Sequence, residues 1–129
     1  MLIEDYCSYE VAKLLDKKGF REYCEAIYFI LENGDYRWSK IDIPIRDCSI
    51  CKPAAILCPT HQMAMKWLRE VHKLHIEISV DINDKHCFYA SIYYNGEECW
   101  EEKEYYPDGV ATYEEAVEAA LKYCLTNLI

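Results

Sequence analysis

The chain of 129 residues has no apolar run that approaches the ~20 residues a helix needs to cross a bilayer. Its first residues, Met-Leu-Ile-Glu-Asp-Tyr, carry acids where a secretory signal would have a basic segment followed by an apolar one. These two absences predict a soluble, cytoplasmic protein.

Basic residues are scarce relative to acidic ones. The 14 Lys and Arg residues stand against 23 Asp and Glu, which gives a net charge of -9, and the excess of acid lies in residues 60–129. Phosphate-backbone binding depends on Lys and Arg that displace counterions. We therefore predict no nucleic acid and no membrane surface as a direct partner.

Glycine is also scarce, and the four glycines all fall at expected turns, so no Gly-rich phosphate loop is present. Carboxylates do occur in pairs, at Glu97–Glu98, Glu101–Glu102 and Glu114–Glu115. General acid–base catalysis needs a carboxyl group held in a pocket, and a solvated face explains these pairs better. Any of eight thiols could meet any of four imidazoles, but no local signature selects one pair. The sequence thus predicts a protein that is not an enzyme, with no catalytic, cofactor-binding or metal residues and no cofactor.

What is present is a globular composition, with 52% apolar residues, and enough chain for one core. We expect a single domain over residues 1–129. It divides into a helix, a hairpin and a connector over residues 1–59 and an α-β-β-β-α unit over residues 60–129.

The α-β-β-β-α unit carries the clearest pattern. The first helix of this unit is predicted from Thr60 to about His72. Its apolar stripe is formed by Ala64, Trp67, Leu68 and Val71. Strict alternation then predicts two half-buried strands. Their inward residues are Ile76, Ile78, Val80 and Ile82 in one strand and Phe88, Ala90, Ile92 and Tyr94 in the next. Turns are expected at residues 83–85 and at Asn95–Gly96.

A third strand, from Cys99 to Tyr106, carries Glu101, Glu102 and Glu104 and is expected at a solvated sheet edge. Thr112 and Glu115 then form a capping box that begins the last helix. The broad apolar face of that helix comprises Ala116, Val117, Ala120, Leu121, Cys124, Leu125 and Leu128.

In the first half, Ser8 and Gly19 bracket a short helix from Tyr9 to about Lys18. Two β-prone runs, residues 25–32 and 36–41, flank Asn33–Gly34 and predict a hairpin. Residues 42–59 are an expected connector with room for a short edge strand. The fold class that follows is α+β: an antiparallel sheet with the C-terminal α-β-β-β-α unit, helices packed on one face, plus the N-terminal helix and hairpin.

One cysteine–histidine set has the spacing of a zinc site: Cys48-x2-Cys51-x6-Cys58-x2-His61. The alternative is that Cys51 and Cys58 pack in the interior while Cys48 and His61 lie at the surface. The sequence favours this second interpretation, because six residues that include Pro53 leave little slack between the pairs. The remaining cysteines are expected to be reduced thiols.

His72 and His75 straddle the boundary between the first helix and strand of the C-terminal unit, and a role at the helix end explains them better than metal binding. The aromatic residues are more informative. Tyr89 and Tyr93 lie on the strand face opposite Phe88, Ala90, Ile92 and Tyr94, and Trp100, Tyr105 and Tyr106 fall nearby. If that face is open, it is an acid-rimmed aromatic surface suited to a protein partner. If the N-terminal hairpin covers it, the tyrosines are core.

Two resemblances bear on function. The element order is similar to the double-stranded RNA-binding domain, but Thr112–Glu118 is acidic where that domain is basic. Segments Pro59–Glu70, His75–Ile78 and Thr112–Leu121 resemble uncharacterised small proteins carried by phages and mobile elements of gut bacteria. That resemblance implies a bacterial cytoplasm and a phage or prophage origin, and it carries no known activity.

The function hypothesis is accordingly a non-enzymatic protein-binding or accessory protein with an unknown protein partner. An acidic nucleic-acid mimic that inhibits a DNA-binding protein is the first alternative, and a small zinc-stabilised domain is the second.

Overall fold

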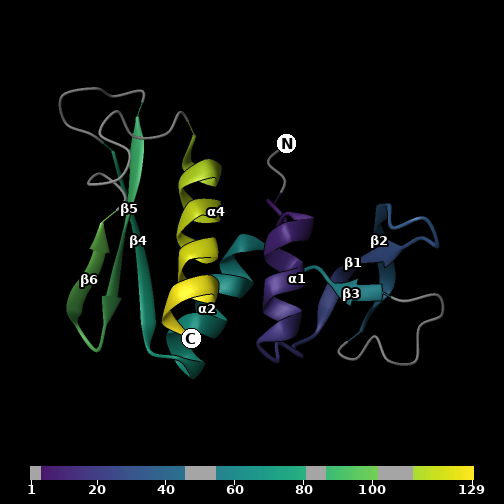
Figure 1. The fold of residues 1–129 in the computed structure, drawn as a ribbon, viewed down its shortest axis with the longest axis horizontal. Coiled ribbons are helices and arrows are strands. Elements are labelled where there is room, and N and C mark those ends of the chain that lie inside the picture. Colours follow the sequence, from purple (N-terminus) through teal and green to yellow (C-terminus); the bar gives the residue numbers. More distant parts are fainter. Residues whose placement is uncertain (1–3, 46–54, 81–86, 102–111) are drawn as a thin grey trace. The chain divides into compact units, whose positions relative to one another are not determined.

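The computed structural model describes residues 4–45, 55–80, 87–101 and 112–129 (Figure 1). It has the predicted α+β class, with two small antiparallel sheets. The chain divides into two compact units, Met1–Met63 (unit 1) and Ala64–Ile129 (unit 2). No helix in the described ranges is long and apolar enough to span a membrane.

Unit 1 begins with α1 (Tyr9–Lys17), whose two ends are fixed as the sequence predicts. The Ser8 hydroxyl accepts a hydrogen bond from the Val11 N–H at 3.2 Å. At the other end the Gly19 N–H donates to the Asp16 carbonyl, and the Phe20 N–H donates to the Leu15 carbonyl. This pair of bonds is the Schellman pattern, which requires a left-handed residue, and Gly19 has φ 90°.

Replacing Gly19 with alanine tests this helix end. A Cβ on Gly19 would meet no atom within 4 Å, so the cost comes from the left-handed backbone alone. We expect the free energy of unfolding to fall by about 1–2 kcal/mol. Lys17→Ala, at an exposed position of the same turn, should change it by less than about 0.5 kcal/mol in the same urea titration.

The sheet of unit 1 contains the predicted hairpin, β1 (Cys24–Ile30) and β2 (Tyr36–Ile45), together with the edge strand β3 (Ala55–Leu57). The strand order is β2-β1-β3 and all pairings are antiparallel. The Asn33–Gly34 turn differs from the expected two-residue form. Only Gly34 has a positive φ, and the Asn33 side chain instead accepts the Asp35 N–H at 3.0 Å.

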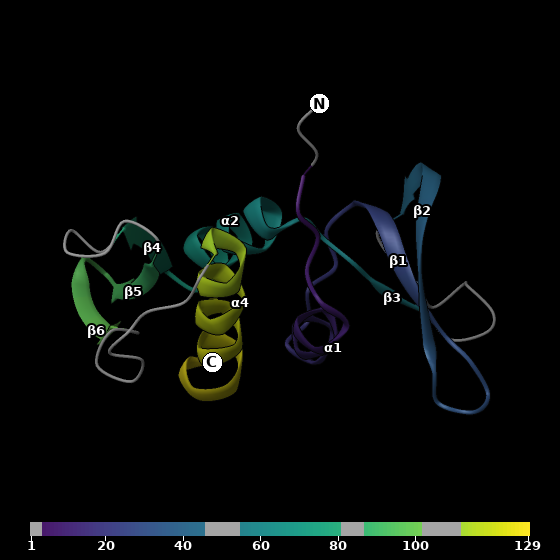
Figure 2. The ribbon, with the colours of Figure 1, turned by 90° about the horizontal axis from the view of Figure 1, so that it is seen from above.

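One face of this sheet and α1 share a core. Alternate residues of β1 point toward α1, which Figure 2 shows nearly end-on beside the strands. The buried residues of this core are Ala12, Ala26, Tyr28, Ile56 and Cys58. The extended residues around Tyr6 lie along the same unit, because Tyr6 forms an antiparallel bridge with Thr60.

Unit 2 holds most of α2 (His61–Val71), the strands β4 (Leu74–Val80), β5 (Phe88–Tyr94) and β6 (Glu97–Glu101), the helix α4 (Tyr113–Tyr123) and a π-helical turn η2 (Cys124–Leu128). The sheet order is β4-β5-β6, again antiparallel. The helices α2 and α4 lie on the same side of this sheet (Figures 1 and 2). The predicted helix-on-sheet arrangement is therefore confirmed.

Both helices of this region begin at a threonine whose hydroxyl caps the first turn, as the sequence predicts for Thr112. The Thr60 hydroxyl accepts the Met63 N–H at 3.2 Å, and the Thr112 hydroxyl accepts the Glu115 N–H at 3.1 Å. The predicted apolar face of α4 is buried through Leu125. The helix does not stay regular over that face, because its last turn widens to the π-helix η2.

Three apolar side chains that the sequence places in the core are exposed instead. Val71, Val80 and Tyr94 are 55%, 46% and 53% exposed. Each is the last residue of its own helix or strand. The central positions Ile76, Ala90 and Ile92 are buried as predicted, and Ile78 is half-buried.

The third strand also differs from the prediction. It begins at Glu97, directly after the Asn95–Gly96 turn, and not at Cys99. Asn95 and Gly96 have φ 50° and 87°, the left-handed pair typical of a two-residue hairpin turn. The predicted strand residues 102–106, the turn at 83–85 and Ile82 lie outside the described residues.

Candidate functional site

The four residues with the spacing of a zinc site divide between described and undescribed parts of the chain. Cys48 and Cys51 lie outside the described residues. Cys58 is buried, and its thiol points to the Cys7 carbonyl oxygen at 3.4 Å. His61 is also buried, contrary to the surface position expected in the zinc-free interpretation, because the start of α2 is tied to the chain by a bond from the His61 N–H to the Asp5 carbonyl at 2.9 Å.

A thiol and an imidazole do come together in unit 1. The Cys7 sulfur lies within 4.8 Å of a His61 ring nitrogen. Both side chains are buried, and the Cys7 thiol faces the Thr60 carbonyl oxygen at 3.9 Å. The five described cysteines, Cys7, Cys24, Cys58, Cys87 and Cys124, are free thiols.

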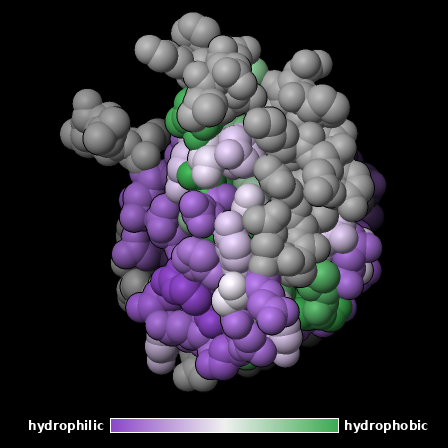
Figure 3. Space-filling view, turned by 90° about the vertical axis from the view of Figure 1, so that its left-hand side faces the viewer, coloured by the Kyte–Doolittle hydropathy of each residue, from purple (hydrophilic) through white to green (hydrophobic). Residues whose placement is uncertain are grey.

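The structure describes part of the aromatic set that the sequence offers as a surface of unit 2. Tyr89 and Tyr93 lie on the face of β5 opposite Ala90 and Ile92, and both are half-buried. Tyr93 is the cross-strand partner of His75, and their ring centroids are 6.4 Å apart. The side of unit 2 that carries β6 is mainly hydrophilic over its described lower part (Figure 3). Tyr105, Tyr106 and the side chain of Trp100 lie outside what the structure describes.

A larger aromatic assembly lies in unit 1, where the sequence did not predict one. Five rings from four segments lie there in two contacting groups, one formed by Tyr9, Tyr28 and Tyr36 and the other by Tyr6 and Trp38. The register places Tyr28 opposite Trp38 on the neighbouring strand, and we call the five residues together the aromatic cluster. Tyr9 and Tyr36 are stacked, with centroids 4.1 Å apart and planes at 11°. Tyr6 meets Trp38 edge-on at 5.2 Å.

The register of the β1–β2 hairpin produces this cluster. Tyr28 pairs directly with Trp38, and Ile30 pairs with Tyr36, so these side chains share the sheet face that α1 covers. Tyr9 of α1 reaches both Tyr28 and Tyr36. One signal in the sequence could have found the cluster. Tyr28 and Ile30 are two positions apart, as are Tyr36 and Trp38, so each pair lies on one face of its strand. The hairpin then places Tyr28 opposite Trp38 and Ile30 opposite Tyr36.

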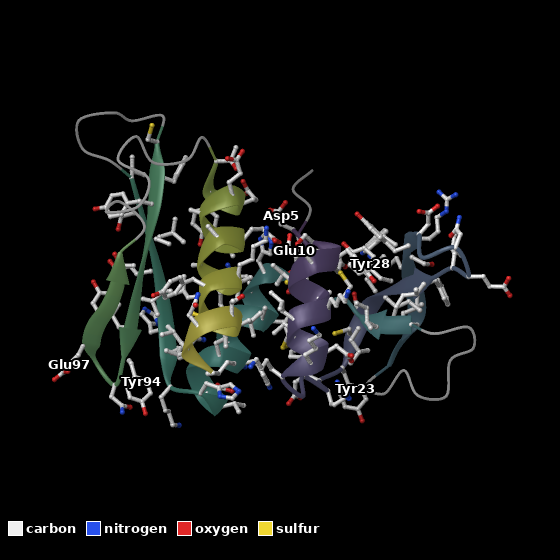
Figure 4. All side chains as sticks on the ribbon, in the orientation of Figure 1. Asp5, Glu10, Tyr23, Tyr28, Tyr94 and Glu97 are labelled. Carbon is white, nitrogen blue, oxygen red and sulfur yellow. The ribbon has the colours of Figure 1, made fainter. Side chains whose placement is uncertain are left out.

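The base of the cluster is anchored in the core. Tyr28 is buried between α1 and the sheet (Figure 4), and its hydroxyl donates to the Cys7 carbonyl oxygen at 2.8 Å. The outer part is open: Tyr36 is 51% exposed and Trp38 is 45% exposed. Both residues lie on β2, which is an edge strand of the sheet.

The carboxylate pairs show no shared pocket. Glu97 is exposed at the β5–β6 turn (Figure 4), and Glu115 is exposed at the first turn of α4, where its N–H takes part in the cap. The side chains of Glu98, Glu101 and Glu102 lie outside the described part of the chain.

No protein-family model matches the sequence, and no curated protein and no solved structure gives a significant match.

Proposed function

We propose that this protein is a non-enzymatic binding protein that contacts a protein partner through the aromatic cluster of unit 1. The observation that carries the proposal is that Tyr36 and Trp38 are exposed and yet held by ring contacts. Both rings are about half exposed, yet both are already fixed by contacts to Tyr9 and Tyr6. Tyrosine and tryptophan are enriched among the few residues that carry most of the binding energy of protein interfaces.

Preorganisation strengthens this argument. A flexible aromatic side chain loses conformational entropy when a partner immobilises it, at about 0.5–1.5 kcal/mol for each ordered side chain. The stacked pair Tyr9–Tyr36 and the edge contact of Tyr6 with Trp38 lower that cost before binding. Exposed rings that already have a fixed orientation are therefore better suited to a partner than isolated exposed rings.

The proposal extends to the origin of the protein. The resemblance to small proteins of phages and mobile elements points to a bacterial partner in the cytoplasm of a host cell. The burial of Cys7 and His61 supports the non-enzymatic part, because a nucleophile must be reached by its substrate.

Replacing Trp38 tests the proposed function. A partner is first isolated with the tagged wild-type protein from a bacterial extract, and its affinity is then measured with purified components. Trp38→Ala should weaken that affinity about 30-fold, which corresponds to about 2 kcal/mol. Tyr94→Ala is a matched control, because Tyr94 is exposed to nearly the same extent as Tyr36 but lies in unit 2.

Salt dependence separates this function from acidic mimicry. Binding through the aromatic cluster should change little between 0.1 and about 0.3 M salt, whereas mimicry of phosphates should weaken steeply as charges are screened. A partner whose affinity falls with salt and is unchanged in Trp38→Ala would contradict the proposal.

A further inference from the structure

A concave feature lies in unit 2, at the end of α2. It is a groove of about 440 Å³ between the last turn of α2, the start of β4 and the end of β5. We call it the helix-end groove, and the side chains that matter are Arg69, Lys73, His75, Glu77 and Tyr93. Its volume falls at the lower end of the range typical of small-molecule sites.

One wall of the groove is cationic although the protein is strongly acidic. Arg69 lies in the last turn of α2 and Lys73 just past the end of the helix, and both are exposed. Arg69 forms no hydrogen bond or ion pair with any residue in the described ranges, while the Lys73 ammonium donates to the Glu70 carbonyl at 3.1 Å. A guanidinium presents a planar fork of donors that matches a carboxylate.

Aromatic rings line the groove beside these cations. His75 and Tyr93 are cross-strand partners, with ring planes at 44° and centroids 6.4 Å apart. Such planar aromatic rings favour stacking or edge contact with another ring. A ligand that binds the cations of the wall through a carboxylate and contacts the rings through an aromatic ring would therefore use both parts of the groove.

The charge of the ligand is limited by Glu77, which also lines the groove. A second negative charge on the ligand would lie near this carboxylate and would be repelled. The layout thus favours a monocarboxylate over a phosphate, which carries more negative charge.

The backbone supplies an independent indication. Lys73 has φ 60°, a left-handed conformation that a glycine adopts without strain, and it stands just past the end of α2 where glycine is the common residue. Its carbonyl also accepts the Asn95 N–H at 3.4 Å. Strained residues concentrate at ligand sites, where the side chain has a role that a glycine could not fill.

We infer that the helix-end groove binds a small aromatic monocarboxylate, with Arg69 as the anchor of the carboxylate and with Lys73 supporting it. This site is separate from the aromatic cluster, and its test does not depend on the proposed protein partner.

The test is a titration of the isotope-labelled protein with benzoate, followed by backbone amide shifts in NMR spectra. Benzoate should shift the amides around Arg69, Lys73, His75 and Tyr93. Arg69→Gln should weaken binding about tenfold, as expected for the loss of a charge-assisted pair. Lys66→Gln, an exposed cation of α2 outside the groove, should leave binding unchanged.

Lys73→Gly separates a ligand role from a structural one. Removing the left-handed strain should raise the melting temperature while benzoate binding weakens. Uncharged benzamide and inorganic phosphate should both bind more weakly than benzoate. The inference is overturned if benzamide or phosphate binds as tightly as benzoate, or if Arg69→Gln binds benzoate like the wild type.

Discussion

Replacing Tyr28 with alanine is expected to lower the free energy of unfolding of unit 1 by about 3–5 kcal/mol. The side chain is buried in the core shared by α1 and the sheet. Its loss removes ring contacts to Tyr9 and Tyr36, and it leaves a cavity that neighbouring strands cannot fill. The measurement is chemical denaturation monitored by the fluorescence of the aromatic residues.

A graded series identifies the cause of that effect. Tyr28→Phe keeps the ring and removes only the bond to the Cys7 carbonyl, so about 1 kcal/mol should be lost. Tyr36→Ala removes the same residue type from an exposed position and should cost about 1 kcal/mol or less. Equal losses for Tyr28→Ala and Tyr36→Ala would show that Tyr28 does not anchor the cluster in the core.

Replacing Ile92 with alanine should destabilise unit 2 by about 2–5 kcal/mol. Ile92 is fully buried in β5, the central strand of the sheet, and it is the cross-strand partner of Ile76. The smaller change Ile92→Val should cost about 0.5–1.5 kcal/mol, because only one methylene group is removed. Urea titration of both variants gives the comparison.

Val80→Ala is the matched control for this series. The alternating pattern places Val80 on the same strand face as Ile76, but the structure leaves it 46% exposed at the end of an edge strand. Its replacement should therefore cost less than about 1 kcal/mol. If Val80→Ala lowered the free energy of unfolding as much as Ile92→Ala, Val80 would be buried, as the periodic pattern predicts. That result would contradict the described packing.

The local elements could be predicted because their signals are short-range. Ser8, Thr60 and Thr112 each cap a helix with their own hydroxyl groups, and Gly19 ends α1 through its own backbone conformation. The alternation around Ile76 and Ile92 identified the buried strand face in the same way. These features depend on residues within a few positions of one another.

The ends of elements could not be predicted so well, for one physical reason. A periodic pattern specifies which face of a helix or strand is apolar, but burial also depends on where the element that covers this face stops. Val71, Val80 and Tyr94 are all terminal residues of their elements, and all three are exposed. The pattern alone assigned each of them to the core.

The candidate site escaped prediction because it is assembled across long separations. Tyr6 meets Trp38, and Tyr9 meets Tyr36, only once α1 has packed against the hairpin. The sequence did predict that hairpin, and it offered an aromatic surface for a partner as one of two interpretations of the strand tyrosines. It placed that surface at Tyr89 and Tyr93, because the alternation there is clear, whereas the register that brings Tyr28 opposite Trp38 was not predicted.

Site-specific photo-crosslinking in bacterial cells tests the central claim most directly. A photoreactive phenylalanine analogue is placed at position 36, at position 38 or, as the control, at position 94. A partner that docks on the aromatic cluster should give the same crosslinked protein at positions 36 and 38 and none at position 94. A crosslink confined to position 94, or one equally strong at all three positions, would contradict the assignment of this surface.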